Sequence, residues 1–329
     1  MKIKQTAYEH IFEIGKYFPQ CHASTIIKTS DGALLAAWFA GTRESHPDVS
    51  IWISKRVKGR WSTPLQLVKS EGVPCWNPVL SKNAAGRLFL YYKVGSSPIA
   101  WHTRFVYSDD AGNSWTMPEE LVKGDLGGRG PVKNKCILLS GGDMLAPASI
   151  ETEQAWDAFV DRSADGMHYK KSSLIPLHHA GLTGKGIIQP TLWESQPGTV
   201  HMLLRSTEGF IYRSDSADDG QTWSFAYPTL LPNNNSGIDL VKVGDVLALV
   251  HNPVGKNWGP RSPIVLSLSA DNGTSWEEAL VLDHNEAPVD KHDGEFSYPA
   301  IIAEGNTLYI TYTWKRRTVA FWEVQCVDD

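Results

Sequence analysis

Ser108-Asp-Asp-Ala-Gly-Asn-Ser-Trp115 is one of three closely similar stretches in this chain of 329 residues. The other two are Ser216-Ala-Asp-Asp-Gly-Gln-Thr-Trp223 and Ser269-Ala-Asp-Asn-Gly-Thr-Ser-Trp276, and all three read Ser-x-Asp-x-Gly-x-[Ser/Thr]-Trp. The Ser and Asp side chains can accept hydrogen bonds from nearby backbone amides, the Gly permits a positive φ angle, and the Trp can pack on the following strand. Because strand-like residues precede each copy, the motif is predicted to be a structural turn of a β-hairpin.

The spacing of these turns predicts an internal repeat. Trp115 and Trp223 are 108 residues apart, a weaker copy of the motif ends halfway between them at Tyr169, and Trp61 lies 54 residues before Trp115. Together with Trp276 they give intervals of 54, 54, 54 and 53 residues. A repeat of this length accommodates four strands, and such repeats with one Trp per unit are typical of β-propellers.

Six strand-like segments that each open on a glycine extend the repeat over the whole chain. They begin at Gly32, Gly86, Gly142, Gly198, Gly244 and Gly305. A polar residue and an apolar run, expected to be the innermost strand of a blade, precede each of them. The six polar residues are His22, Asn77, Asn134, Gln189, Asn235 and Tyr298. We therefore predict an all-β fold, a single six-bladed β-propeller domain over residues 1–329, in which residues 7–14 pair with the C-terminal strands and close the ring.

Composition and charge disfavour several classes of function. A net charge of −5 without a basic run argues against a nucleic-acid surface. The chain has no run of about 18 apolar residues and no apolar segment typical of a signal peptide near Met1, so neither a membrane partner nor secretion is expected, and the cytoplasm is the expected location. The four cysteines lack metal-ligand spacing, and no phosphate or dinucleotide motif is present, so no metal or cofactor is expected. The sequence leaves the oligomeric state open.

Charged and polar residues are predicted to gather at one mouth of the central channel, where the innermost strands begin. A ring just beyond the second strands would hold Arg43, Lys93, Ser149, Arg205, His251 and Thr313. The loops would add Asp48, Glu151, Glu208, Arg261, Asp290, His292, Asp293 and Glu295. This mixture of cations, acids, imidazoles and a Tyr predicts a functional site at the mouth.

The three repeated turns resemble the Asp boxes of the sialidase superfamily, and the whole chain resembles its bacterial BNR-repeat, sialidase-like branch. In that family an arginine opens the first inner strand, followed along the chain by an acid/base Asp, a Glu, two more arginines and a Tyr nucleophile. The resemblance implies that Asp48 is the acid/base, that Arg205 and Arg261 are the second and third arginines, and that Tyr298 is the nucleophile. His22 stands in the place of the first arginine, and Gln189 stands in the place of the Glu.

These assignments predict a glycoside hydrolase that acts on a terminal acidic sugar of a small oligosaccharide or glycan. Asp48 would protonate the leaving oxygen while Tyr298 attacks, or Glu295 would activate water. A polysaccharide lyase that acts on a uronate, with Tyr298 or His22 as base, and a non-catalytic carbohydrate-binding propeller are the alternatives. The predicted catalytic residues are Asp48, Tyr298, Glu295 and His22. The predicted substrate-binding residues are Arg43, Arg205, Arg261, Gln189, Asn77, Lys93 and His251.

Overall fold

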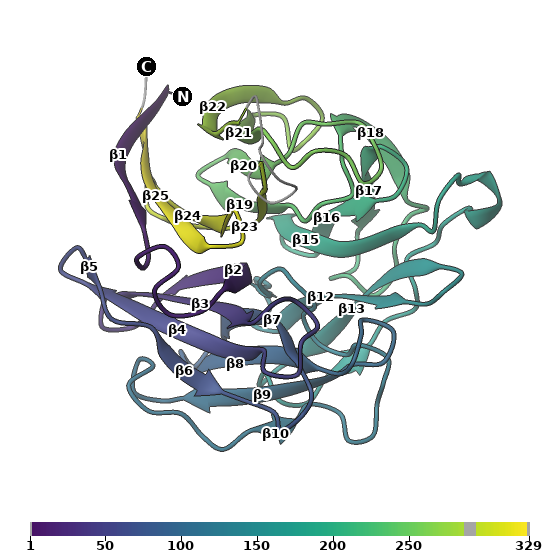
Figure 1. The fold of residues 1–329 in the computed structure, drawn as a ribbon. Coiled ribbons are helices and arrows are strands. Elements are labelled where there is room, and N and C mark those ends of the chain that lie inside the picture. Colours follow the sequence, from purple (N-terminus) through teal and green to yellow (C-terminus); the bar gives the residue numbers. More distant parts are fainter. Residues whose placement is uncertain (1, 286–293, 328–329) are drawn as a thin grey trace.

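Six antiparallel sheets stand around a central axis in the computed structural model, which describes residues 2–285 and 294–327 (Figure 1). Each sheet is one blade and contains four or five strands. The predicted six-bladed β-propeller is therefore confirmed. Within the described ranges, no helix is long and apolar enough to cross a membrane.

Blades 1 to 3 follow one another along the chain. Blade 1 contains β2 (Gln20–Lys28), β3 (Leu34–Gly41), β4 (Ser50–Val57), β5 (Arg60–Trp61) and β6 (Leu65–Val68), which pairs with β4. Blade 2 contains β7 (Cys75–Lys82), β8 (Leu88–Val94), β9 (His102–Ser108) and β10 (Glu119–Glu120). Blade 3 contains β11 (Ile137–Leu138), β12 (Met144–Glu151), β13 (Trp156–Ser163) and β14 (Lys170–Lys171).

Blades 4 to 6 complete the ring after the short helix η1 (His179–Gly181). Blade 4 contains β15 (Ile187–Gln196), β16 (Thr199–Ser206), β17 (Phe210–Ser216) and β18 (Tyr227–Pro232). Blade 5 contains β19 (Asp239–Val243), β20 (Val246–His251), β21 (Ile264–Ser269) and β22 (Glu277–Asp283). Blade 6 contains β23 (Phe296–Glu304), β24 (Thr307–Trp314), β25 (Thr318–Val327) and β1 (Lys2–His10).

Blade 6 joins the two ends of the chain, as predicted. β1 pairs with β25 from Lys2 opposite Val327 to His10 opposite Ala320, and Figure 1 shows the two strands side by side. The strand covers residues 2–10 rather than 7–14. The reason is that the chain turns inward after His10, where Phe12 is buried and its ring stacks on Trp38 with 4.9 Å between the ring centroids. The pairing covers the outer edge of β25.

The Asp-box turns are held by local hydrogen bonds, as their sequence predicts. In the first copy, Asp110 Oδ1 accepts from the backbone amides of Asn113 (3.0 Å) and Ser114 (2.8 Å). The Ser108 hydroxyl accepts from the amide of Gly112 (2.8 Å), whose φ is 82°. Hydrogen bonds from Ser114 are the main cause that lowers the pKa of Asp110 to about 2, so this carboxylate is ionised and serves the turn.

Bulges aim the first residues of the innermost strands at the channel. Asn77, Gln189 and Tyr298 have φ of 39°, 53° and 53°, and each lies where the pairing with the second strand shifts register. In blade 1 the residue with this conformation is Ala23 (φ 54°), so His22 stands one residue ahead of the position expected from the repeat. Non-glycine residues adopt this left-handed conformation only where the surrounding structure holds them.

Apolar side chains fill the space between neighbouring blades. Between blades 1 and 2, Leu35 and Ile51 pack with Leu80 and Leu90 in one buried cluster. Packing on both faces of each sheet fixes the tilt of the blades, and with it the positions of the residues around the channel mouth.

Candidate functional site

All six blades contribute to a pocket of about 330 Å³ at the mouth of the channel. Its charged and polar side chains come mainly from blades 1, 4, 5 and 6, and its tryptophans come from blades 2, 3 and 5. The lining residues are His22, Glu44, Trp76, Asn77, Pro98, Trp101, Glu151, Trp156, Gln189, Arg205, Trp258, Arg261, Tyr298 and Arg316. Six of the predicted site residues are among them: His22, Asn77, Gln189, Arg205, Arg261 and Tyr298.

A larger cavity, of about 520 Å³, lies between blade 3 and the Asp-box turn of blade 4. Its lining carries Lys170 and Lys171, and its one carboxylate, Asp143, accepts a hydrogen bond from Arg162 (2.6 Å). The smaller pocket is the better candidate because charged and polar side chains from all six blades converge there.

Arg205 is fixed against Tyr298 at the centre of the pocket. Its Nη1 donates to the Tyr298 hydroxyl (2.6 Å) and to Gln189 Oε1 (3.1 Å), and its Nε donates to Asn235 Oδ1 (2.7 Å). The guanidinium carbon also lies 5.5 Å from the centroid of the Trp156 ring. These contacts hold a buried cation in one orientation, directly beside the predicted nucleophile.

Glu295 joins two further arginines beneath the pocket. Its Oε1 accepts from Arg261 Nη1 (2.7 Å) and from Arg316 Nε (2.8 Å). Although burial opposes ionisation, the positive charges of Arg261 and Arg316 hold the pKa of Glu295 well below its ordinary value. The described geometry therefore uses this carboxylate to orient two guanidinium groups, of which Arg316 also donates to Glu44 Oε2 (2.6 Å).

Arg316 is a pocket residue that the sequence analysis did not identify. It lies in the turn between β24 and β25 with a φ of 59°. The only signal in the sequence is the basic run Lys315-Arg-Arg317 between two apolar strands, and such a run usually indicates a solvated turn. Its position brings a third guanidinium group close to the site where His22 occupies the place of the family's first arginine.

His22 lies beside the charged group formed by Glu295, Arg261 and Arg316. The imidazole is buried, its ring centroid lies 4.2 Å from that of Tyr298, and its Nδ1 lies 2.9 Å from Thr313 Oγ1. Burial, followed by the positive charge of Arg316, lowers the pKa of His22 well below its ordinary value. The ring is therefore neutral at neutral pH and adds no further positive charge to the pocket.

Glu151 is the pocket carboxyl group whose environment favours its protonated form. It ends β12, and burial raises its pKa although the positive charges of Arg205 and Lys185 oppose the shift. The sequence placed Glu151 on the rim but gave it no role. A carboxyl group with a raised pKa holds its proton more firmly than an ordinary glutamate, which suits it to be a general acid.

Lys133 lies behind the pocket lining, next to Tyr298. This buried amine donates to Asn134 Oδ1 (2.8 Å), to the backbone carbonyl of Ile238 (3.0 Å) and to that of Pro299. Its Nζ lies 5.9 Å from the centroid of the Tyr298 ring. Because Pro299 directly follows Tyr298, this contact helps to hold the left-handed conformation of the tyrosine.

Four tryptophans form an aromatic wall. Trp76 and Trp101 meet edge to face with 6.1 Å between centroids, and Trp156 and Trp258 do so at 6.3 Å. Trp258 is 64% exposed and stands at the rim. Apolar faces of sugar rings pack well on such surfaces, a role that the high Trp content alone could not separate from core packing.

Besides Glu295, which lies beneath the pocket, four predicted site residues lie outside its lining. Asp48 accepts from the backbone amide of Thr42 (3.1 Å) and lies 2.7 Å from His46 Nδ1, in the loop that also carries the exposed Arg43. Lys93 is buried between strands, where it donates to Thr103 Oγ1 (2.6 Å), and burial lowers its pKa to about 7. These roles stay predictions.

His251 is the fourth of these residues. It is buried at the end of β20, its Nε2 lies 3.1 Å from Ser267 Oγ, and burial lowers its pKa to about 4. The rim positions Asp290, His292 and Asp293 lie outside the described residues. In the part of the chain that the structure describes, no group of three or more His, Cys, Asp or Glu side chains is arranged to hold a metal ion.

Comparisons with known proteins agree with this architecture. Residues 32–310 match the family model described as a BNR repeat-like domain. No curated protein matches the chain at a significant level. A Hadza microbial sialidase is similar in structure, with a TM-score of 0.79 and 14% sequence identity over 97% of this chain and 68% of the other.

Two further solved structures show the same fold. A protein of unknown function from Dyadobacter fermentans has a TM-score of 0.75 and 13% identity over 99% of both chains. A mutant of the NanB sialidase from Streptococcus pneumoniae has a TM-score of 0.75 and 12% identity over 97% of this chain and 71% of the other. Since the family model covers most of the propeller, the chain belongs to the BNR repeat-like domain family.

Proposed function

We propose that the protein is a glycoside hydrolase that binds a terminal acidic sugar of a small oligosaccharide or glycan in the channel pocket. The observation that carries this proposal is the convergence of three guanidinium groups, from Arg205, Arg261 and Arg316, around Tyr298. A carboxylate can accept charge-assisted hydrogen bonds from such groups, each worth about 1.5–3 kcal/mol. The sialidase names of similar structures support an acidic sugar as the ligand.

Tyr298 is proposed as the nucleophile and Glu151 as the proton donor. The Tyr298 oxygen attacks the anomeric carbon and passes its proton to the neutral His22, while Glu151 transfers its own proton to the oxygen of the leaving group as the glycosidic bond breaks. Arg205 donates to the phenol oxygen and stabilises negative charge that develops there. Water then attacks the anomeric carbon and releases the sugar from Tyr298, with Glu151 taking a proton from the water and His22 returning a proton to the phenolate.

Asp48 remains the acid implied by the family resemblance. Its carboxylate faces Thr42 and His46, and hydrogen bonds from these groups lower its pKa although its partial burial opposes the shift. An ionised carboxylate on an exposed loop is a poorer proton donor than the partly buried Glu151, whose pKa is raised, so replacing each acid in turn distinguishes the two assignments.

A uronate lyase is the second candidate, and the contact between His22 and Tyr298 favours it. In that reaction the arginines neutralise the uronate carboxylate. Tyr298, once its own proton has passed to His22, removes the proton from C5 and gives it to the leaving oxygen as the glycosidic bond breaks. No acid is needed at Asp48, and Gln189 would hydrogen-bond the substrate instead of activating the tyrosine. A neutral His22 beside the phenol is suited to relay the proton.

The experiment is an activity panel of sialosides, Kdo-type oligosaccharides and uronate-bearing oligosaccharides, with binding measured by calorimetry. A gain of reducing ends without new ultraviolet absorbance means hydrolysis, and absorbance from a new carbon–carbon double bond conjugated to the carboxylate means elimination. Binding without turnover means a carbohydrate-binding propeller. No binding of any acidic sugar would refute the proposal.

Tyr298→Phe is the informative variant, and Tyr309→Phe is its control. Tyr309 lies in the same blade and stacks on Phe321, away from the pocket. We expect Tyr298→Phe to abolish turnover with binding retained and Tyr309→Phe to leave both unchanged. Full activity of Tyr298→Phe would remove the tyrosine from the mechanism.

A further inference from the structure

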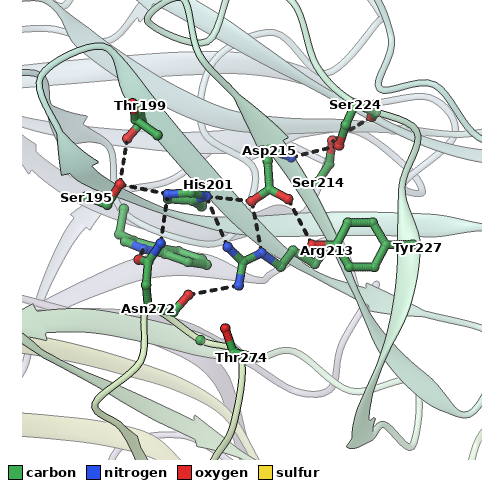
Figure 2. A network of polar contacts seen from close by, with 12 residues as sticks. Ser195, Thr199, His201, Arg213, Ser214, Asp215, Ser224, Tyr227, Asn272 and Thr274 are labelled. Atoms are coloured by element: carbon green, nitrogen blue, oxygen red, sulfur yellow. Dashed lines mark hydrogen bonds and ion pairs between the residues drawn. The ribbon is translucent and has the colours of Figure 1, made fainter.

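A second cluster of reactive side chains lies in blade 4 (Figure 2). Ser195 is on β15, His201 is on β16 and Asp215 is on β17. On β16, His201 precedes the pocket residue Arg205 by four positions, which is about 13 Å along an extended strand. The cluster is therefore separate from the channel pocket.

The three side chains form one hydrogen-bonded row. Ser195 Oγ lies 2.8 Å from His201 Nε2, and His201 Nδ1 lies 2.5 Å from Asp215 Oδ1. With its proton on Nδ1, the imidazole donates to Asp215 and can accept the proton of the Ser195 hydroxyl. This is the order of nucleophile, base and orienting carboxylate found in serine hydrolases on unrelated folds.

The surroundings fix the row in this geometry. His201 is buried and stacks on Trp193 with 4.9 Å between the ring centroids, whereas Ser195 is partly exposed. Asp215 Oδ1 also accepts from Arg213 Nε (2.9 Å). Burial raises the pKa of Asp215, but hydrogen bonds from His201 and Arg213 outweigh it and lower the pKa to about 2, so the carboxylate stays ionised.

Asn272, from the Asp-box turn of blade 5, places its side-chain amide beside the imidazole of His201. Its Oδ1 accepts from Trp193 Nε1 (2.7 Å), which turns its Nδ2 toward His201, 3.2 Å from Nε2 (Figure 2). Side-chain amides in such positions stabilise the oxyanion that forms during acyl transfer.

The repeat itself indicates that the fold does not require these polar residues. Asp215 directly precedes the Asp-box serine of blade 4, and His201 faces it on the neighbouring strand. At the position of Asp215, blades 2, 3 and 5 have Tyr107, Arg162 and Leu268. Facing them, at the position of His201, they have Phe89, Leu145 and Ala248.

The hydrogen-bonded row is also not needed to attach the Asp-box turn of blade 5 to blade 4. Arg213 Nη1 donates to the backbone carbonyl of Asn272 (2.8 Å), and in blade 1 a single side chain, Lys55, attaches the next turn by donating to the carbonyl of Ala111 (3.0 Å). A buried imidazole costs free energy unless it is hydrogen-bonded, so its presence where other blades bury apolar groups points to a function.

We propose that Ser195, His201 and Asp215 form an acyl-transfer site that hydrolyses esters of small acyl groups such as acetate. Ser195 Oγ attacks the ester carbonyl carbon while its proton passes to His201 Nε2, and Asn272 donates to the oxyanion. The carbon–oxygen bond to the alcohol breaks, His201 protonates the leaving alkoxide, and the acyl group remains on Ser195. Water, deprotonated by His201, then releases the acid.

The test measures hydrolysis of 4-nitrophenyl acetate by the full chain, together with labelling by a fluorophosphonate and identification of the modified peptide by mass spectrometry. We expect a rate above that of the heat-denatured chain and a label on Ser195. Ser195→Ala should lose the label and at least tenfold of the rate, and Asp215→Asn should lose a similar factor.

Ser224→Ala is the matched control. Ser224 belongs to the same network, where its hydroxyl accepts from the Asp215 amide (3.0 Å), but it does not contact His201. We expect its rate to stay within twofold of the original chain, and thermal unfolding verifies that each variant is folded. A rate equal to that of the denatured chain, a label on another residue, or an unchanged rate in Ser195→Ala would overturn the proposal. The channel pocket takes no part in this assay, so the result is independent of the proposed glycosidase.

Discussion

Replacing Glu295 by Gln tests whether this carboxylate holds the arginines of the pocket in place. The change keeps the shape of the side chain and removes the charge that pairs with Arg261 and Arg316. The side chains of Glu295, Arg261 and Arg316 are only 7%, 18% and 10% exposed, so solvent screens these pairs little. Breaking a buried pair by removing one partner costs about 3–5 kcal/mol.

That loss converts into a measurable change of melting temperature. With an unfolding entropy of about 2.1 cal/mol/K per residue, a chain of this length has roughly 0.7 kcal/mol/K in total. Glu295→Gln should therefore lower the midpoint of thermal unfolding by about 4–7 °C at pH 7. Glu304→Gln is the control, because Glu304 pairs with Lys28 at 3.5 Å on the surface of the same blade, and exposed pairs contribute about 0–1 kcal/mol.

The pH dependence supplies a second check of the same reasoning. The pKa of Glu295 is lowered in the folded state. Its contribution to stability is therefore complete above its pKa in the unfolded chain, about 4.3, and is lost as the pH falls below that pKa. The difference in free energy of unfolding between the original chain and Glu295→Gln should therefore shrink by about 1.4 kcal/mol for each pH unit below that pKa. Equal effects of Glu295→Gln and Glu304→Gln at pH 7, or a difference that does not narrow in acid, would refute the pairing.

Three further predictions address the chemistry of the pocket. Glu151→Gln should lower kcat at least a hundredfold with little change of KM, whereas Asp48→Asn should have a smaller effect, and the reverse order would assign the acid to Asp48. Arg205→Gln should weaken binding of an acidic monosaccharide by about 10- to 100-fold in calorimetry, and unchanged affinity would exclude a carboxylate contact. Burial lowers the pKa of Lys133 to about 7, below the unfolded value of about 10.4. The folded state therefore binds fewer protons than the unfolded state, and the free energy of unfolding should rise with pH above 7. Lys133→Met should reduce the slope of this rise. Lys93→Met should reduce the slope in the same way, but only Lys133→Met should lower turnover, and equal turnover in both would separate Lys133 from the site.

The repeat was predictable from the sequence because the interactions that form it are local. Each Asp-box carboxylate bonds amides three and four residues ahead, so the turn is encoded within eight residues wherever it occurs. The inner strands were predictable for the same reason, since Gln189 and Tyr298 are each followed by Pro at a bulge that recurs with the period.

The composition of the pocket was less predictable because it depends on contacts between blades. Arg316 enters the site through the turn between the second and third strands of blade 6, and the corresponding loops of the other blades differ in length and sequence. Trp258 resembles any core tryptophan until its exposure is known. Lys93 matched the predicted ring by its place at the end of a strand, but its side chain lies between strands. The place of a residue in its strand fixes its backbone position, but packing decides where its side chain lies.

The pairing of β1 with β25 determines how the ring responds to tension. Lys2, at the start of β1, lies opposite Val327, at the end of β25, so these two residues stand together at one end of the strand pair. A force that pulls these ends apart breaks the pairs between β1 and β25 one after another, from Lys2 toward His10, and so opens the ring. Mechanical resistance of the propeller at this seam is therefore low, even though the blades on either side are densely packed.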